Sequence, residues 1–198
     1  MTGRSRSSLR GSTGNSSTIT RRVIQVTAAE FWNIIACSSE GASGIRQQES
    51  RLRRLLMKLD PDQIVSFNEW FGRFVREAFL YRLWGAAWLI GDGCSDDGFW
   101  DFRCWLVARG EHTYRRALDD PDSLSEVVTG KARLSALSFS NPAMFVWAEK
   151  LGKNESDLDE FPQSWGSNPG ETPSDEPFLE DGGYLRERYP KLWKVVKE

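Results

Sequence analysis

The densest group of chemically useful side chains lies at residues 91–99, where the sequence reads Gly-Asp-Gly-Cys-Ser-Asp-Asp-Gly-Phe. Three Asp, one Cys and one Ser stand together between two strongly apolar segments, and Arg103 follows one helical turn later. Clustered carboxylates are the groups that general acid–base catalysis and hard cations such as Mg²⁺ use. A guanidinium nearby binds carboxylates and phosphates. This stretch is therefore the first candidate for a site.

Helix geometry explains part of the stretch. Ser95 is predicted to N-cap a helix over residues 96–109, with the following glycine as its C-cap. Asp96 and Asp97 then lie in the first turn, where unpaired amides and the helix dipole stabilise carboxylates. At about 100° per residue, Arg103 falls near the centre of the apolar face. The other residues of that face are Phe99, Phe102, Leu106 and Val107.

Arg103 is the unusual residue of this helix, because a buried guanidinium keeps its charge and needs an anionic partner. One interpretation is an ion pair that orders the helix junction and has no other role. The other is a pocket for a polar or anionic ligand, or for the acidic or C-terminal group of a partner protein, with tryptophans as its apolar wall. The carboxylates that could pair with Arg103 are Glu77, Asp92, Asp96, Asp120 and Asp122. The candidate ligand-binding residues are Trp84, Trp88, Ser95, Asp96, Asp97 and Arg103.

An enzyme is the alternative from a different functional class. Asp96 or Asp97 would act as general base in a hydrolase or a peptide-modifying enzyme, with or without Mg²⁺. Asp92, Asp96 and Asp97 have the right chemistry for magnesium, although helix caps have the same sequence pattern. A calcium loop is excluded because Cys104 stands where its twelfth residue, a Glu, is required. The sequence predicts no cofactor and no metal ligand set.

The remaining reactive side chains are few. Cys94, near a helix N-terminus, is either a reactive thiol or a small buried residue, and burial is the expected state. His112 is the only histidine, so a catalytic triad or a His-based metal site has one donor at most. We expect His112 at the surface or near a helix cap.

Composition limits the classes of protein. The chain has 198 residues, enough for one domain, and 39% of them are hydrophobic, including nine Trp and eleven Phe. A net charge of −2 gives no overall field toward nucleic acid or an anionic membrane. No apolar run reaches the ~18 residues of a membrane helix. Three Cys without a secretion signal indicate reduced thiols in the cytoplasm. The expected partner is a protein or a small polar ligand.

Charge divides the chain into regions. Residues 1–24 are predicted to be a disordered Arg- and Ser-rich tail, a composition that organellar transit peptides share. Residues 27–198 are predicted to form one helical domain. Within it, residues 154–181 hold nine Asp or Glu, four Pro and no Lys or Arg, which predicts an irregular acidic strap over the core. A short amphipathic helix should end the chain.

The periodicity of the core predicts an all-α fold. Thr27 and Glu30 form a capping-box pattern, and leucines follow one helix face over residues 46–59. Asp60-Pro61 should begin a helix that continues to about Ile90, and its second half is apolar nearly all round. Such a helix is expected to be buried at the centre of the domain. Further helices should open at Asp120-Pro121 and Asn141-Pro142.

The sequence resembles a bacterial family catalogued as domain-of-unknown-function family 4240, over roughly residues 27–198. The resemblance implies no particular activity and assigns no catalytic residue, and residues 1–22 lie outside it. The elements that carry it are Phe31-Trp32, Leu83-Trp84-Gly85-Ala86-Ala87, Gly93-Cys94-Ser95-Asp96-Asp97-Gly98-Phe99, Phe102-Arg103-x-Trp105-Leu106, Gly110, Asp120-Pro121-Asp122-Ser123-Leu124 and Tyr189-Pro190-Lys191-Leu192-Trp193.

Overall fold

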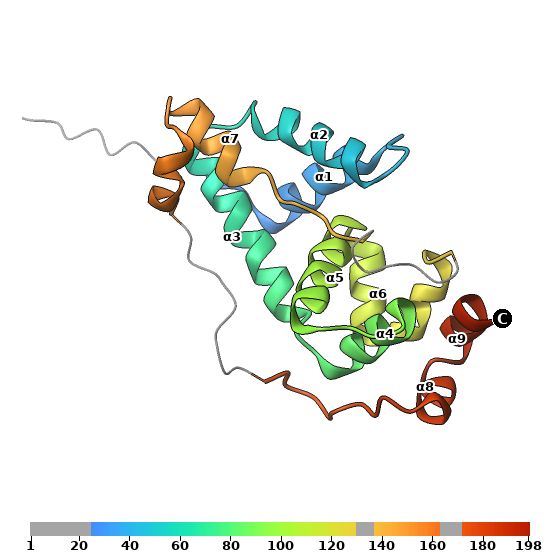
Figure 1. The fold of residues 1–198 in the computed structure, drawn as a ribbon. Helices are drawn as coiled ribbons and strands as arrows, with labels where there is room; N and C mark the ends of the chain where they lie inside the picture. The colour runs from blue at the N-terminus through green and yellow to red at the C-terminus, as the bar shows by residue number, and fades with distance from the viewer. Residues whose placement is uncertain (1–24, 130–136, 163–171) are drawn as a thin grey trace, which may run out of the picture.

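The protein is all-α, as predicted: over the residues that the computed structural model describes, 25–129, 137–162 and 172–198, there are helices and no strand (Figure 1). The predicted tail, residues 1–24, lies outside the described residues, as does the 163–171 part of the strap. The elements in chain order are α1 (Ala28–Ser39), α2 (Ile45–Leu56), α3 (Pro61–Glu77), α4 (Tyr81–Gly91), α5 (Asp96–Ala108), α6 (Glu111–Asp119), η1 (Pro121–Glu126), α7 (Ala143–Lys150), η3 (Glu155–Glu160), α8 (Gly182–Arg188) and α9 (Pro190–Lys197).

Local capping begins several helices where the sequence predicts. The Glu30 N–H donates to Thr27 Oγ1 at 3.3 Å, and the Thr27 N–H donates to the Glu30 carboxylate at 2.8 Å. Asp60 caps α3 in the same reciprocal way, and Asp120 caps η1 by accepting from the Asp122 N–H at 3.1 Å. Each cap pairs amides that a helix start leaves without partners.

Helix α3 is the central element of the aromatic core. It packs against α1, α5 and α7, and Figure 1 shows it running diagonally between α1 and α7 toward α5. Its Phe67, Phe71 and Phe74 meet Phe31 of α1 at ring-centroid distances of 4.9, 6.4 and 5.2 Å. These rings are almost fully buried, so their removal from water is a main source of stability.

The single helix expected over residues 61–90 is wrong, because two helices occupy this range. Helix α3 ends at Glu77, and Leu80 adopts an extended backbone with φ −130° and ψ 135° before α4 begins. The Asp175 carboxylate accepts hydrogen bonds from the N–H groups of Tyr81 and Arg82 and pairs with the Arg82 guanidinium at 3.3 Å. The start of α4 is therefore capped by the strap, far along the chain, which no local pattern could reveal.

The C-terminal segment wraps around α4 and η1 (Figure 1). Residues 172–181 are irregular, as predicted, whereas Glu155–Glu160 forms the short 3₁₀ helix η3. The predicted short helix at the end of the chain is α9, which Pro190 starts directly after α8. The Asp122 carboxylate accepts from the N–H groups of Lys191 and Leu192 at 3.1 and 2.7 Å. The described residues contain no helix that is long and apolar enough to cross a membrane.

Candidate functional site

The acidic motif begins α5, as expected. Ser95 Oγ accepts a hydrogen bond from the Gly98 N–H at 3.2 Å, and Asp96 and Asp97 are exposed in the first turn. In the part of the chain that the structure describes, no group of three or more His, Cys, Asp or Glu is arranged to hold a metal ion. The local arrangement is that of a helix N-terminus with stabilising carboxylates.

Arg103 is buried, with 6% of its surface exposed, and its guanidinium meets backbone oxygens and aromatic rings. Nη1 donates to the Val75 carbonyl at 3.0 Å, and Nε donates to the Phe99 carbonyl at 3.4 Å. The guanidinium carbon lies 4.6, 4.9 and 5.2 Å from the ring centroids of Phe79, Phe99 and Trp100. Burial lowers the pKa of Arg103 to about 10, so the group still carries its charge at neutral pH.

The expectation that a carboxylate of the chain pairs with Arg103 is wrong for the described residues, since its contacts there include no ion pair. Val75 lies in the last turn of α3, where carbonyls lack helical donors and the helix dipole is negative. Phe79, just beyond the helix end, donates its N–H to the Arg76 carbonyl, which leaves the Val75 carbonyl to Arg103. Arg103 therefore caps the C-terminus of α3 at the break before α4.

Two of the expected partners form ion pairs elsewhere. The Glu77 carboxylate accepts from Arg115 at 2.9 Å. Asp92 pairs with Lys197 of α9 at 2.6 Å. These carboxylates therefore tie α6 and α9 to neighbouring elements and do not contact Arg103.

The other expected partners act as helix caps. The Asp120 carboxylate accepts a hydrogen bond from the Asp122 N–H at the start of η1. The Asp122 carboxylate accepts hydrogen bonds from two backbone N–H groups at the start of α9. Asp96 remains in the exposed first turn of α5. Asp120 and Asp122 therefore act at two other helix ends, and Asp96 stays in the first turn of its own helix.

The two tryptophans expected to line a ligand pocket are packed against other rings. Trp84 Nε1 donates to the Cys94 carbonyl at 3.0 Å, and the Trp84 ring stacks on Phe99 at 4.8 Å. The ring centroid of Phe178, in the strap, lies 6.5 Å from that of Trp84 and 6.1 Å from that of Trp88. The structure thus brings Trp84 to the motif, and a ligand site at this place stays a prediction.

Cys94 is buried and His112 is at the surface, as the sequence predicts. Burial raises the pKa of the Cys94 thiol to about 12, so the thiol is neutral at physiological pH. His112 is exposed in the first turn of α6. Cys37 is exposed, Cys104 is buried, and all three cysteines are free thiols.

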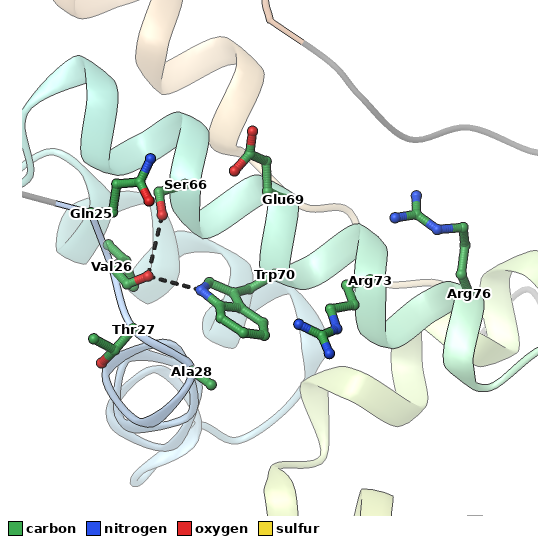
Figure 2. Close-up of a pocket in the computed structure, with 9 residues that line it drawn as sticks. All are labelled: Gln25, Val26, Thr27, Ala28, Ser66, Glu69, Trp70, Arg73 and Arg76. Carbon is green, nitrogen blue, oxygen red and sulfur yellow. Dashed lines mark hydrogen bonds between the residues drawn. The ribbon is translucent and has the colours of Figure 1, made fainter. Parts of the chain in front are cut away.

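A groove of about 530 Å³ lies between α3 and the segment that leads into α1 (Figure 2). The Val26 carbonyl accepts from Ser66 Oγ at 3.2 Å and from Trp70 Nε1 at 2.8 Å, which holds the two segments together. Figure 2 shows Gln25 and Ser66 toward one end and Arg76 at the other. The lining comes from residues 25–28 and from Ser66, Glu69, Trp70, Arg73 and Arg76.

The groove carries two guanidiniums that form no ion pair with any described residue. The Arg73 guanidinium lies 4.9 Å from the Trp70 ring centroid, and the Arg76 side chain is exposed one turn further along α3. The sequence reasoning missed this site. A signal was present, because Trp70, Arg73 and Arg76 recur every three residues on the otherwise polar face of α3.

Comparison with known proteins places the chain in a family. A family described as "Protein of unknown function (DUF4240)" matches residues 26–150, more than half of the sequence. The chain belongs to this family. The DUF4240 span contains α1 to α7, Arg103 and nearly all of the groove, and it ends before the strap, α8 and α9. No curated protein and no solved structure matches the chain.

Proposed function

We propose that this protein is a cytoplasmic binding domain of a bacterial cell, and that its groove between α1 and α3 takes an acidic peptide segment of a partner protein. The main support is that two guanidiniums in the groove, those of Arg73 and Arg76, form no ion pair with a carboxylate of the described chain. Unpaired guanidiniums beside an aromatic ring are a common recognition device for carboxylates. The three free cysteines support a reducing compartment.

The shape of the groove favours a peptide over a small anion. Its α3 side extends from Ser66 to Arg76, about 15 Å at ~1.5 Å per residue. An extended chain of four or five residues covers that length at ~3.3 Å each. The half-buried ring of Trp70 offers apolar area to a side chain of the peptide, and the two guanidiniums offer hydrogen bonds to its carboxylates.

For the motif at Asp96 and Arg103 we propose a structural role. The support is that Arg103 meets the carbonyls of Val75 and Phe99, and that Ser95 caps α5. An anionic ligand at this place and an Asp-dependent enzyme reaction remain hypotheses from the sequence. Ligand capture by the groove does not depend on either of them.

The test uses fluorescence anisotropy with a fluorescein-labelled octapeptide of alternating Glu and Leu, and the same peptide with Gln for Glu. We expect the Glu peptide to bind and the Gln peptide to bind about tenfold more weakly or not at all. Arg73→Gln and Arg76→Gln should each weaken binding by about tenfold, because each removes a charge-assisted contact. Affinity should fall as salt rises.

Arg54→Gln is the matched control, since Arg54 is an exposed arginine of α2 outside the groove. It should leave binding unchanged within about twofold, as expected for surface charges far from a contact. Equal losses in all three variants would mean unspecific attraction and would refute the groove. Inorganic phosphate that displaces the peptide at equal concentration would point to a small-anion site instead.

A further inference from the structure

The last part of the strap is an acidic segment that exposes an apolar side chain. This acidic segment, residues 176–181, reads Glu-Pro-Phe-Leu-Glu-Asp and holds no Lys or Arg. Leu179 is 61% exposed, the highest value among the large hydrophobic residues that the structure describes. Glu180 and Asp181, which follow it, are exposed as well. An exposed leucine beside carboxylates is the chemistry that the groove between α1 and α3 is proposed to take.

The carboxylates of the acidic segment are available to another molecule. Glu180 forms no hydrogen bond or ion pair with any described residue. Asp181 caps α8 by accepting from two N–H groups at 2.9 and 3.0 Å. Both bonds end on Oδ1, which leaves Oδ2 of this exposed side chain for another donor. Two neighbouring carboxylates thus match, in number and in sign, the two unpaired guanidiniums of the groove.

The acidic segment is held on the α4 side of the molecule. The Asp175 carboxylate accepts from the first N–H groups of α4, and the Phe178 ring lies beside those of Trp84 and Trp88. Asp181 fixes the other end at α8. Figure 1 shows the segment running past α4 to α8, away from α1. It cannot enter the groove of its own chain without leaving these contacts, so its exposed side is turned to a second molecule.

The order of the groups is the same on the two surfaces. In the groove, the half-buried Trp70 ring comes first, and the two exposed arginines follow at intervals of three residues, about 4.5 Å at ~1.5 Å per residue. In the acidic segment, Leu179 is followed by Glu180 and Asp181 at ~3.3 Å each. Consecutive side chains of an extended segment point to opposite sides. Figure 2 shows the two arginine side chains extending from α3 in different directions, which suits such a pair of carboxylates.

We propose that the groove of one molecule takes the acidic segment of a second copy of this chain, so that the protein associates head to tail. This inference rests on the proposed function of the groove and names its partner. Leu179 packs on the Trp70 ring of the other molecule, and Glu180 and Asp181 accept hydrogen bonds from its two guanidiniums. Because the segment is fixed at both ends beforehand, little ordering is needed on binding. The two surfaces differ, so association can continue beyond a dimer.

The test is sedimentation velocity of the full chain from about 1 μM to about 1 mM, a range that covers moderate and weak affinities. We expect wild type to form dimers and larger species as concentration rises, and salt to weaken them. Arg73→Gln damages the groove and Glu180→Gln damages the acidic segment, so each should weaken association by about tenfold. Glu155→Gln is the matched control, since it makes the same change at an exposed position of η3, outside both surfaces, and should associate as wild type does.

An equimolar mixture of the Arg73→Gln and Glu180→Gln proteins tests both surfaces at once. The first variant keeps an intact acidic segment and the second keeps an intact groove. The mixture should therefore form a heterodimer and stop there, because the other two surfaces of the pair are damaged. A mixture that stays monomeric, while each variant keeps the circular dichroism spectrum of wild type, would overturn the proposal.

Two other results would overturn it. One is association that neither Arg73→Gln nor Glu180→Gln weakens, because the copies would then meet through another surface. The other is a wild-type chain that stays monomeric over the whole range. In that case the Glu and Leu octapeptide separates the two proposals: if it binds, the groove takes an acidic segment of a different protein, and if it does not bind, the proposed function of the groove is refuted as well.

Discussion

Replacing Arg103 by methionine tests how a buried guanidinium without a carboxylate stabilises this fold. The change keeps the length and much of the volume of the side chain and removes its charge and donors. In wild type the guanidinium caps the last turn of α3 through the Val75 carbonyl and lies against three aromatic rings. Methionine keeps the apolar contacts only.

The expected loss is about 2 kcal/mol of unfolding free energy. A hydrogen bond from a charged donor contributes on the order of 1.5–3 kcal/mol, and the cation–π contacts add about 1 kcal/mol. Relief from burying the charge offsets part of this loss, as it does when buried ion pairs are replaced by apolar residues. For a chain of this length, 2 kcal/mol lowers the melting temperature by about 4–8 °C. Arg103→Lys keeps the charge but has no planar fork, so it should lose about half as much.

The assay is urea unfolding followed by circular dichroism at the helical band, with thermal melts beside it. Asp96→Asn is the decisive companion, because Asp96 is exposed in the first turn of α5 and does not contact Arg103. It should change stability by less than about 0.5 kcal/mol. A stable or more stable Arg103→Met would refute the capping role. An Asp96→Asn loss as large as that of Arg103→Met would show that the two residues pair in solution.

Three further changes probe the packing around this centre. Gly85→Ala places a Cβ 2.5 Å from Tyr189 Oη, so we expect a loss of about 1–3 kcal/mol and faster proteolysis of the C-terminal helices. Asp122→Ala removes the acceptor of two α9 amides, so it should lower the unfolding free energy by about 1–2 kcal/mol, as measured by urea unfolding. Asp119→Asn, at an exposed position of α6, is the control and should leave the unfolding free energy unchanged within about 0.5 kcal/mol. Burial raises the pKa of the Cys104 thiol from 9.0 to about 12, so the folded state keeps a proton that the unfolded chain loses above pH 9. Stability should be full below pH 9, and the Cys104 thiol should then lower it by about 1.4 kcal/mol per pH unit toward pH 12. Cys94 has a similarly raised pKa and adds a similar slope, so Cys104→Ala should reduce the fall by about half.

The sequence by itself determined four of the helix starts and the class of fold. Thr27, Asp60, Ser95 and Asp120 each cap a helix that begins at the next residue, because a cap is a bond between groups two or three residues apart. The 3.6-residue periodicity predicted the buried face of α3, and the position of Arg103 on the inner face of α5 followed from the same geometry.

Only the tertiary structure decided which groups the polar side chains contact. The break between α3 and α4 depends on Asp175 and on Arg103, which approach residues 75–82 from distant parts of the chain. The buried Arg103 guanidinium contacts a helix C-terminus and aromatic ring faces instead of a carboxylate. Together, the dipoles of these groups can stabilise the charge as a carboxylate would. The groove with Arg73 arises in the same way, since it is a space between elements. A sequence determines which groups are available, and the packing of helices determines which of them are left without a partner.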